Sequence, residues 1–159
     1  MQLEGKPVRE SHAEIVEVVL PNDANPLGTI LGGKVLHLVD IVAAVAAYRH
    51  SRTYVVTAAM DHVDFRHPIR VGDLVILKSS VNRVFQTSME VGVKVFSENI
   101  LTGERRHTSS AYVTFVALDS EGQPITIPPV IPESEEEKRR YEQAEARRRY
   151  RLEQRARPR

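Results

Sequence analysis

The chain has 159 residues, which is enough for one domain of ordinary size with its own hydrophobic core. Its 22 Lys and Arg residues nearly balance 21 Asp and Glu residues, so the net charge of +1 indicates neither a nucleic-acid nor a membrane partner. Cysteine is absent, which excludes a disulfide framework, a thiolate metal site and a cysteine nucleophile. The start of the chain lacks the apolar core of a signal peptide, and we therefore expect a cytoplasmic protein.

The N-terminal part of the chain predicts a loose lead-in followed by one strand. Residues 1–11 are polar, whereas residues 12–20 alternate apolar with charged side chains and are rich in β-branched residues. Pro21 ends this strand, and a loop containing Pro26 and three glycines follows it.

The run from Gly33 to His50 predicts the central element of the domain. It is rich in alanine and has no further Gly or Pro, which favours a helix. Its apolar side chains lie on every side, which is typical of a buried helix. The run is too short for a membrane span and is interrupted by Lys34, His37 and Asp40.

After the helix, the chain is rich in valine, isoleucine, threonine and aromatic residues at alternating positions. Four β-rich runs are separated by short, turn-like connections: residues 54–65, 74–82, 88–96 and 108–118. Short connections favour antiparallel pairing over parallel crossovers. We therefore predict an α+β fold in which one antiparallel sheet curls around one central helix.

The C-terminal part predicts a separate, charged helix. Residues 121–132 contain four prolines and close a domain that we place at residues 1–132. Residues 133–159 carry ten Lys and Arg against seven Glu, with pairs such as Glu136 and Arg140 in the favourable i, i+4 order. We interpret this tail as a solvated or partly frayed helix. The alternatives are that its arginines reach the phosphates of a ligand, or that it docks on a neighbouring subunit.

The glycine loop is the first candidate for chemistry. Residues 28–34 nearly spell a phosphate-binding loop, but Val35 stands where a hydroxyl should hold magnesium, so we reject nucleotide hydrolysis. Gly32 and Gly33 lead into the helix without a capping residue directly before them, so the first-turn N–H groups are free to bind a negative group. The alternative is a tight turn capped by water or by Thr29.

Asp40 is the second candidate, because a carboxylate within an apolar helix is costly unless it is paired or used. It lies about two turns beyond Gly33. Apolar surroundings would raise its basicity and suit a general base or a nucleophile. An ion pair with His37 or with an arginine is an equally good interpretation.

Other polar residues carry weaker signals. Asn25 precedes a proline, which favours a turn residue. His62, Asp64 and His67 do not have the spacing of a standard metal site, so we predict no metal. The serine pair at 109–110 lacks the G-x-S-x-G context of a serine nucleophile.

Several stretches resemble the acyl-CoA thioesterase branch of the hotdog-fold superfamily. Residues 23–40, D-A-N-P-L-G-T-I-L-G-G-K-V-L-H-L-V-D, fit its N-x-x-G-x-x-x-G-G-x-x-(L/M)-x-x-x-D pattern, and A-A-Y-R-H follows at 46–50. Residues 55–73, 88–95 and 111–119 are also similar, so the resemblance covers roughly residues 10–130. One departure is Leu31, where the family often has His or Phe before the paired glycines.

The resemblance implies hydrolysis of acyl-CoA to a free carboxylic acid and CoA by a homodimer whose sheets join edge to edge, often assembled into a hexamer. Asn25 and the Gly33 region of one subunit would face Asp40 of the partner subunit. The Gly33 N–H and the helix dipole would stabilise the oxyanion. Asp40 would act as general base or nucleophile, and Asn25 would orient the water or the carbonyl.

The resemblance also suggests where CoA binds. Its arm would pass Gly32 and run along the sheet edge near Val56 and Thr57, and its phosphates would meet Arg83 and Ser88. No cofactor is implied apart from CoA as part of the substrate.

Two alternatives are a non-catalytic acyl-CoA-binding hotdog regulator and a hotdog dehydratase. A regulator of this kind usually has a fused DNA-binding segment, for which the lead-in before the first strand is too short, and Asp40 and Asn25 argue against it. Asp40 in this pattern fits a thioesterase better than a dehydratase. No motif indicates the length or type of the acyl chain.

Overall fold

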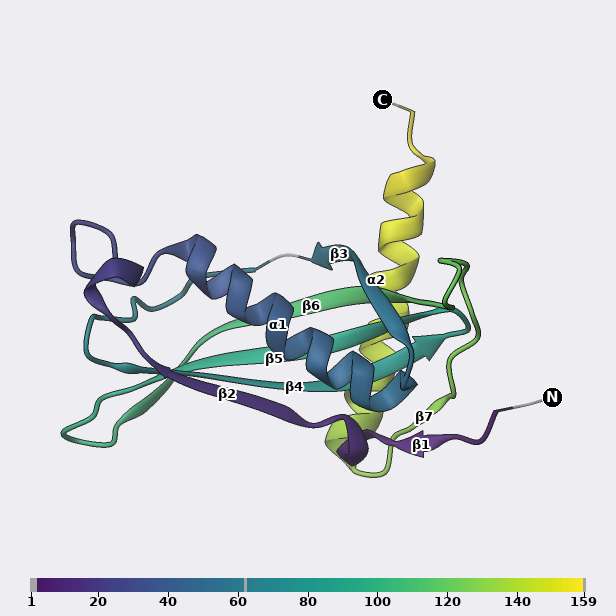
Figure 1. Ribbon diagram of the computed structural model, residues 1–159, viewed down its shortest axis with the longest axis horizontal. Coiled ribbons are helices and arrows are strands. Elements are labelled where there is room, and N and C mark those ends of the chain that lie inside the picture. The colour runs from purple at the N-terminus through teal and green to yellow at the C-terminus, as the bar shows by residue number, and fades with distance from the viewer. Residues whose placement is uncertain (1–2, 62, 159) are drawn as a thin grey trace.

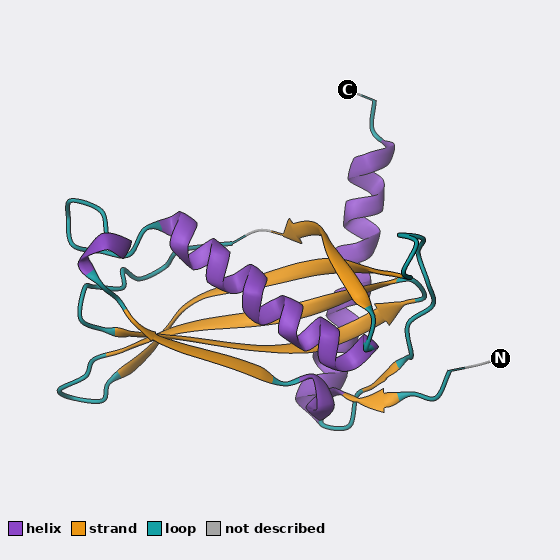
Figure 2. Ribbon diagram, viewed as in Figure 1, coloured by secondary structure: helices purple, strands orange, loops and turns teal. Residues whose placement is uncertain are grey.

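The computed structural model describes residues 3–61 and 63–158 of the chain. Its main sheet has five antiparallel strands in the order β2-β4-β5-β6-β3. The strands are β2 (Ala13–Val18), β3 (Tyr54–Asp61), β4 (Leu74–Phe85), β5 (Ser88–Glu98) and β6 (Arg105–Leu118). The sheet curls around the long helix α1 (Gly32–Ser51), which lies across its concave face (Figures 1 and 2). The predicted α+β architecture of one helix wrapped by an antiparallel sheet is confirmed.

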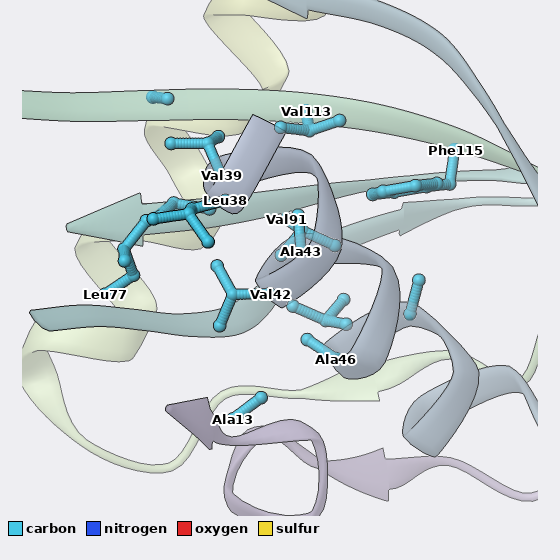
Figure 3. Close-up of a cluster of buried hydrophobic side chains, with 14 of the residues drawn as sticks. Ala13, Leu38, Val39, Val42, Ala43, Ala46, Leu77, Val91, Val113 and Phe115 are labelled. Atoms are coloured by element: carbon cyan, nitrogen blue, oxygen red, sulfur yellow. The ribbon is translucent and has the colours of Figure 1, made fainter. Parts of the chain in front are cut away.

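The core lies between α1 and the inner face of the sheet. Every second residue of each long strand points toward the helix, as the period of two in a strand requires. Figure 3 shows this contact, in which apolar helix residues meet apolar strand residues: Leu38, Val39, Val42, Ala43 and Ala46 with Leu77, Val91, Val113 and Phe115. The alanines let the helix approach the sheet closely, which explains why an alanine-rich helix occupies this place.

One side of α1 is left open within the chain. Leu36, Ile41 and Tyr48 are 36%, 40% and 45% exposed. The expectation that α1 is buried on every side is therefore wrong for this side of the helix in a single chain. Several large apolar side chains on one open side of a helix are costly to expose, so this side is suited to being covered by another surface.

Residues 6–11 form short regular elements, contrary to the predicted loose lead-in. Four short elements were not predicted: β1 (Lys6–Pro7), η1 (Val8–Ser11), η2 (Pro21–Asp23) and β7 (Val130–Ile131). Strands β1 and β7 pair in parallel, and Lys6 Nζ donates to the carbonyl oxygens of Arg49 and His50 at the C-terminal end of α1. The side chain of Ser11 accepts a hydrogen bond from the amide of Val81 at 2.9 Å. These contacts join residues far apart in the sequence, so no local pattern reveals them.

The C-terminal helix α2 (Glu135–Ala156) packs on the outer face of the sheet, opposite α1, and its end extends beyond the sheet (Figure 1). Ser134 caps its first turn together with Glu137. Ala144 is completely buried, and Arg147 Nε donates to Glu90 Oε1 at 2.6 Å. The interpretation of residues 133–159 as a solvated tail is therefore wrong for the part of α2 that covers the sheet.

His50 near the end of α1 makes the stability of the fold depend on pH. The residue is fully buried, and its Nε2 lies 2.7 Å from the carbonyl oxygen of Pro128. Burial lowers the pKa of His50 below its usual value of 6.5, and the hydrogen bond to Pro128 only partly opposes this. Below about pH 6.5 the unfolded chain therefore binds a proton that the folded chain does not, and the free energy of unfolding falls.

We expect urea unfolding of the native chain to show a loss of stability from pH 7.5 to pH 5.5 that His50→Gln largely removes. The His50 contribution has a limiting slope of about 1.4 kcal/mol per pH unit. His12→Gln is the matched control, because His12 is exposed. An equal slope in His50→Gln and in the native chain would contradict this account.

Candidate active site

A hydrogen bond between α1 and β3 fixes the carboxylate of Asp40. Thr57 Oγ1 donates to Asp40 Oδ1 at 2.8 Å. Thr57 points from β3 toward α1, directly before the point where the β3–β6 register shifts. Neither His37 nor an arginine is seen to pair with Asp40 among the described residues. The half-buried carboxylate thus receives one neutral hydrogen bond on Oδ1, and its Oδ2 has no hydrogen-bond donor among these residues.

The N-terminus of α1 is uncapped and open. No side chain caps it, and the amides of Lys34 and Val35 donate to the carbonyl of Leu31. The amides of Gly32 and Gly33 are then the first-turn donors without an intrahelical acceptor. A Cβ at Gly33 would meet nothing within 4 Å. An acceptor atom can therefore approach this amide closely, at the positive end of the helix dipole.

Asn25 holds the loop that leads into this helix end. Its Oδ1 accepts from the amides of Leu27 at 2.9 Å and Thr29 at 3.2 Å, and its Nδ2 donates to Thr29 Oγ1 at 2.8 Å. Asn25 is thus a turn residue in this chain, as its place before Pro26 favours. Thr29 is engaged by Asn25 and does not cap α1, which removes one alternative for the glycine turn.

The free amide of Gly33 and the carboxylate of Asp40 lie apart within one chain. Gly33 and Asp40 are seven residues apart on the same helix, which is about 10 Å along its axis. One carbonyl group cannot contact both the Gly33 amide and the Asp40 carboxylate of the same chain. Gly33 and Asp40 both lie toward the side of α1 where Leu36 and Ile41 are exposed.

Comparison with known proteins decides the family. The Thioesterase superfamily model matches residues 27–104. A Bacillus subtilis protein named as an uncharacterized acyl-CoA thioester hydrolase is 46% identical over 129 residues, which are 81% of this chain and 75% of the relative.

The chain belongs to the acyl-CoA thioesterase family.

Solved structures of thioesterases agree with this assignment. A hexameric acyl-CoA thioesterase superposes with a TM-score of 0.94 at 46% identity, covering 97% of this chain and 99% of the other. The acyl-CoA hydrolase of Staphylococcus aureus, solved with butyryl-CoA and CoA, has a TM-score of 0.89 at 36% identity, covering 94% and 92%. That enzyme was also solved with an Asn, an Asp or a Thr replaced by Ala, in that order along its chain.

Three of the predicted CoA-binding residues of this thioesterase lie on strands of the main sheet. Thr57 and Val56 are both exposed on β3, an edge strand, and Thr57 also donates to Asp40. Ser88 begins β5, and the register places Ser88, Val116 and Val56 in one row across three strands.

Arg83 does not reach the α1 side of the thioesterase sheet. Its Nη1 donates to the carbonyl of Tyr141 at 3.2 Å, its guanidinium lies 4.0 Å from the Tyr141 ring centroid, and it pairs with Glu145 at 3.7 Å. Arg83 therefore holds α2 on the outer face. This role does not favour the predicted contact with CoA phosphates.

The role of Thr57 toward Asp40 was missed by sequence reasoning, which assigned Thr57 to the CoA arm. No local pattern links two residues so far apart in the sequence and on different elements.

His62 of the possible metal trio lies outside the described residues, and the absence of a metal site stays a prediction. Among the described residues no group of three potential ligands could hold a metal, and no helix is long and apolar enough to cross a membrane.

Proposed function

We propose that this thioesterase hydrolyses acyl-CoA to a free carboxylic acid and CoA, at sites formed where two chains meet. The observation that carries the proposal is the Thr57–Asp40 hydrogen bond on the open side of α1. Further support comes from the Asn, Asp and Thr replaced in the Staphylococcus aureus enzyme. Asn25, Asp40 and Thr57 are of the same three types and have the same spacing along the chain as those three residues.

In the proposed reaction, the thioester carbonyl oxygen binds at the N-terminus of α1. The Gly33 amide and the helix dipole stabilise the negative charge that develops on this oxygen. Asp40 of the partner subunit accepts the proton of a water whose oxygen attacks the carbonyl carbon. The C–S bond then breaks, and CoA leaves as a thiol after receiving that proton. Direct attack by Asp40, with an anhydride that water later opens, uses the same geometry.

Thr57 and Asn25 have positioning roles in this mechanism. Thr57 occupies Oδ1 of Asp40, which leaves Oδ2 to face the water or the carbonyl carbon. Asn25 holds the loop that presents the Gly33 amide, through its bonds to Leu27 and Thr29. In this proposal Asn25 acts on the reaction through the loop, so its loss would lower the rate without removing the base.

The proposed homodimer follows from the distance between the Gly33 amide and the Asp40 carboxylate within one chain. Because about 10 Å of helix separates Gly33 from Asp40, a complete site needs the two residues from different chains. The exposed apolar side of α1 and the free edge of β3 offer surfaces for such a contact. A hexamer built from three dimers is the assembly that we propose. The location that we propose is the cytoplasm, which the name of a rat relative, a cytosolic acyl coenzyme A thioester hydrolase, supports.

We expect two impaired variants to restore activity when their subunits are mixed. Asp40→Asn lacks the base, and Asn25→Ala lacks the ordered loop at the N-terminus of α1. A mixed dimer then has one damaged site with both changes and one intact site. After denaturation and refolding of an equal mixture, we expect about a quarter of native activity, since half of the dimers are mixed.

The measurement is release of CoA thiol from short-chain, long-chain and aromatic acyl-CoA substrates, with the best substrate used for the mixing experiment. Each variant refolded alone is the control. Activity of the mixture no higher than the mean of the two controls would place Asn25 and Asp40 in the same site of one chain. Binding of acyl-CoA without thiol release by the native chain would favour the non-catalytic regulator instead.

A further inference from the structure

A hollow lies on the face of the sheet opposite to the Asp40 side chain. It measures about 670 Å³ and is open on one side. Its floor is formed by the outer face of β4, β5 and β6, and the first turns of α2 border it through Glu136 and Arg140. Figure 1 shows α2 crossing this face of the sheet, whereas α1 lies on the other face. The hollow is therefore separated from Asp40 of the same chain by the sheet.

The floor of the hollow brings two lysines together. Lys78 of β4 is directly opposite Lys94 of β5, and Lys94 is opposite Ser110 of β6. In the next row with the same orientation, Gly92 lies between Ser80 and Tyr112. Because Gly92 has no side chain, the side chain of Asn82 fits over this position, in the row next to the two lysines. Like charges directly opposite each other on one face of a sheet destabilise it unless something neutralises them.

The carboxylates near the hollow neutralise these lysines only in part. Lys94 Nζ lies 3.5 Å from Glu136 Oε1, but Arg140 Nη2 binds the same oxygen at 2.5 Å. Lys78 has no carboxylate within 4.0 Å among the described residues, although Glu14 of β2 is directly opposite it in the register and lines the hollow. With Arg49 also on its rim, the hollow has four cationic side chains against two carboxylates.

A buried amide adds a hydrogen-bond donor without an acceptor. Asn82 is 3% exposed and lines the hollow, and its Nδ2 has no hydrogen-bond partner among the residues that the structure describes. A Cβ at Gly92 would lie 2.7 Å from this nitrogen, which means that the amide of Asn82 lies over the floor glycine. A buried donor without a partner is costly, and such groups are uncommon in folded proteins.

We propose that this hollow binds a small phosphate ester that is distinct from the substrate. A phosphate group offers a double negative charge and several acceptor oxygens, which match the ammonium groups of Lys78 and Lys94. The amide of Asn82, which is enclosed in this structure, turns toward the anion when it binds. The hollow is larger than a phosphate group, so the rest of the ester lies beside Phe96 and Tyr112 in its wall. Since Arg140 belongs to α2, the bound anion also links this helix to the sheet.

Calorimetric titration of the full chain with inorganic pyrophosphate, at constant ionic strength, tests this site. We expect saturable binding of one pyrophosphate per chain. Lys78→Met and Lys94→Met each remove a charge-assisted contact and should weaken the binding about tenfold or more. Lys138→Met is the matched control, because Lys138 is exposed on α2 and does not line the hollow. Thermal unfolding of each variant without the probe checks that it is folded.

Absence of saturable binding to the native chain at millimolar pyrophosphate would overturn the proposal, as would unchanged affinity in both variants. The kinetics of acyl-CoA hydrolysis separate a distinct ligand from the phosphates of CoA itself. A phosphate ester distinct from the substrate predicts that Lys78→Met and Lys94→Met leave kcat and KM unchanged. A higher KM for acyl-CoA in both variants would assign the hollow to CoA and overturn the claim of a second ligand. This readout does not depend on which residue is the catalytic base.

Discussion

Asp40→Asn should lower kcat for acyl-CoA hydrolysis by about 10² to 10⁴-fold, the usual contribution of a positioned general base. The substitution keeps the size of the side chain, and Thr57 Oγ1 can still donate to the remaining carbonyl oxygen as it does to Asp40 Oδ1. An amide, however, neither accepts a proton from water at neutral pH nor attacks a thioester. We therefore expect the loss in kcat, with little change in the thermal unfolding midpoint. Thiol release and circular dichroism measure the two quantities.

Glu121→Gln is the matched control for this experiment, because Glu121 is exposed and lies in a turn after β6, outside the proposed site. It removes one carboxylate from the chain without touching α1. Native activity in a folded Asp40→Asn protein would remove Asp40 from the mechanism. A large loss in Glu121→Gln as well would show that the assay responds to charge in general.

Much of the fold follows from local patterns in the sequence. The alternation of apolar residues along the strands reports which face is buried, and the alanine-rich run after Gly33 reports a helix that approaches a sheet closely. These signals are local because each depends on the period of one element. The same holds for the free amides of Gly32 and Gly33, since the lack of a capping residue is visible in the sequence.

The features that sequence reasoning missed depend on contacts between distant segments. Glu90 occupies an outward position of β5, where a charged residue is normally solvated, and yet α2 covers it completely. The same helix engages Arg83, which sequence reasoning had assigned to CoA. Thr57 meets Asp40 only because β3 lies next to α1 in the folded chain. None of these pairings has a spacing signature.

The ion pair between Glu90 and Arg147 carries the second large expected effect. Arg147 donates through Nε to Glu90 Oε1 at 2.6 Å, and its guanidinium lies 3.6 Å from the ring centroid of Tyr112. Burial raises the pKa of Glu90, while the hydrogen bond and charge of Arg147 oppose that rise. Arg147→Ala leaves a buried carboxylate without its partner and should lower the free energy of unfolding by about 3 kcal/mol at pH 7.5.

The pH dependence of this loss distinguishes a buried charge from lost packing. Without Arg147, the pKa of Glu90 in the folded chain rises further above its usual value of 4.5. The folded variant then keeps a proton on Glu90 that the unfolded chain releases, so stability increases as the pH falls from 7.5 toward 4.5. Urea unfolding should therefore give a smaller deficit at pH 5 than at pH 7.5. A deficit independent of pH would instead indicate lost contact with Tyr112.

Two further variants complete this test of how α2 is held. Arg149→Ala removes an exposed arginine of the same helix, which lies 4.0 Å from Glu145, and should cost at most about 0.5 kcal/mol. Replacing both Glu90 and Arg147 with Leu removes the charges together and should recover most of the loss, to within about 1 kcal/mol of the native chain. This recovery is expected because desolvation of Glu90 offsets most of what the ion pair contributes. If the double variant is as unstable as Arg147→Ala, the pair itself holds α2 on the sheet.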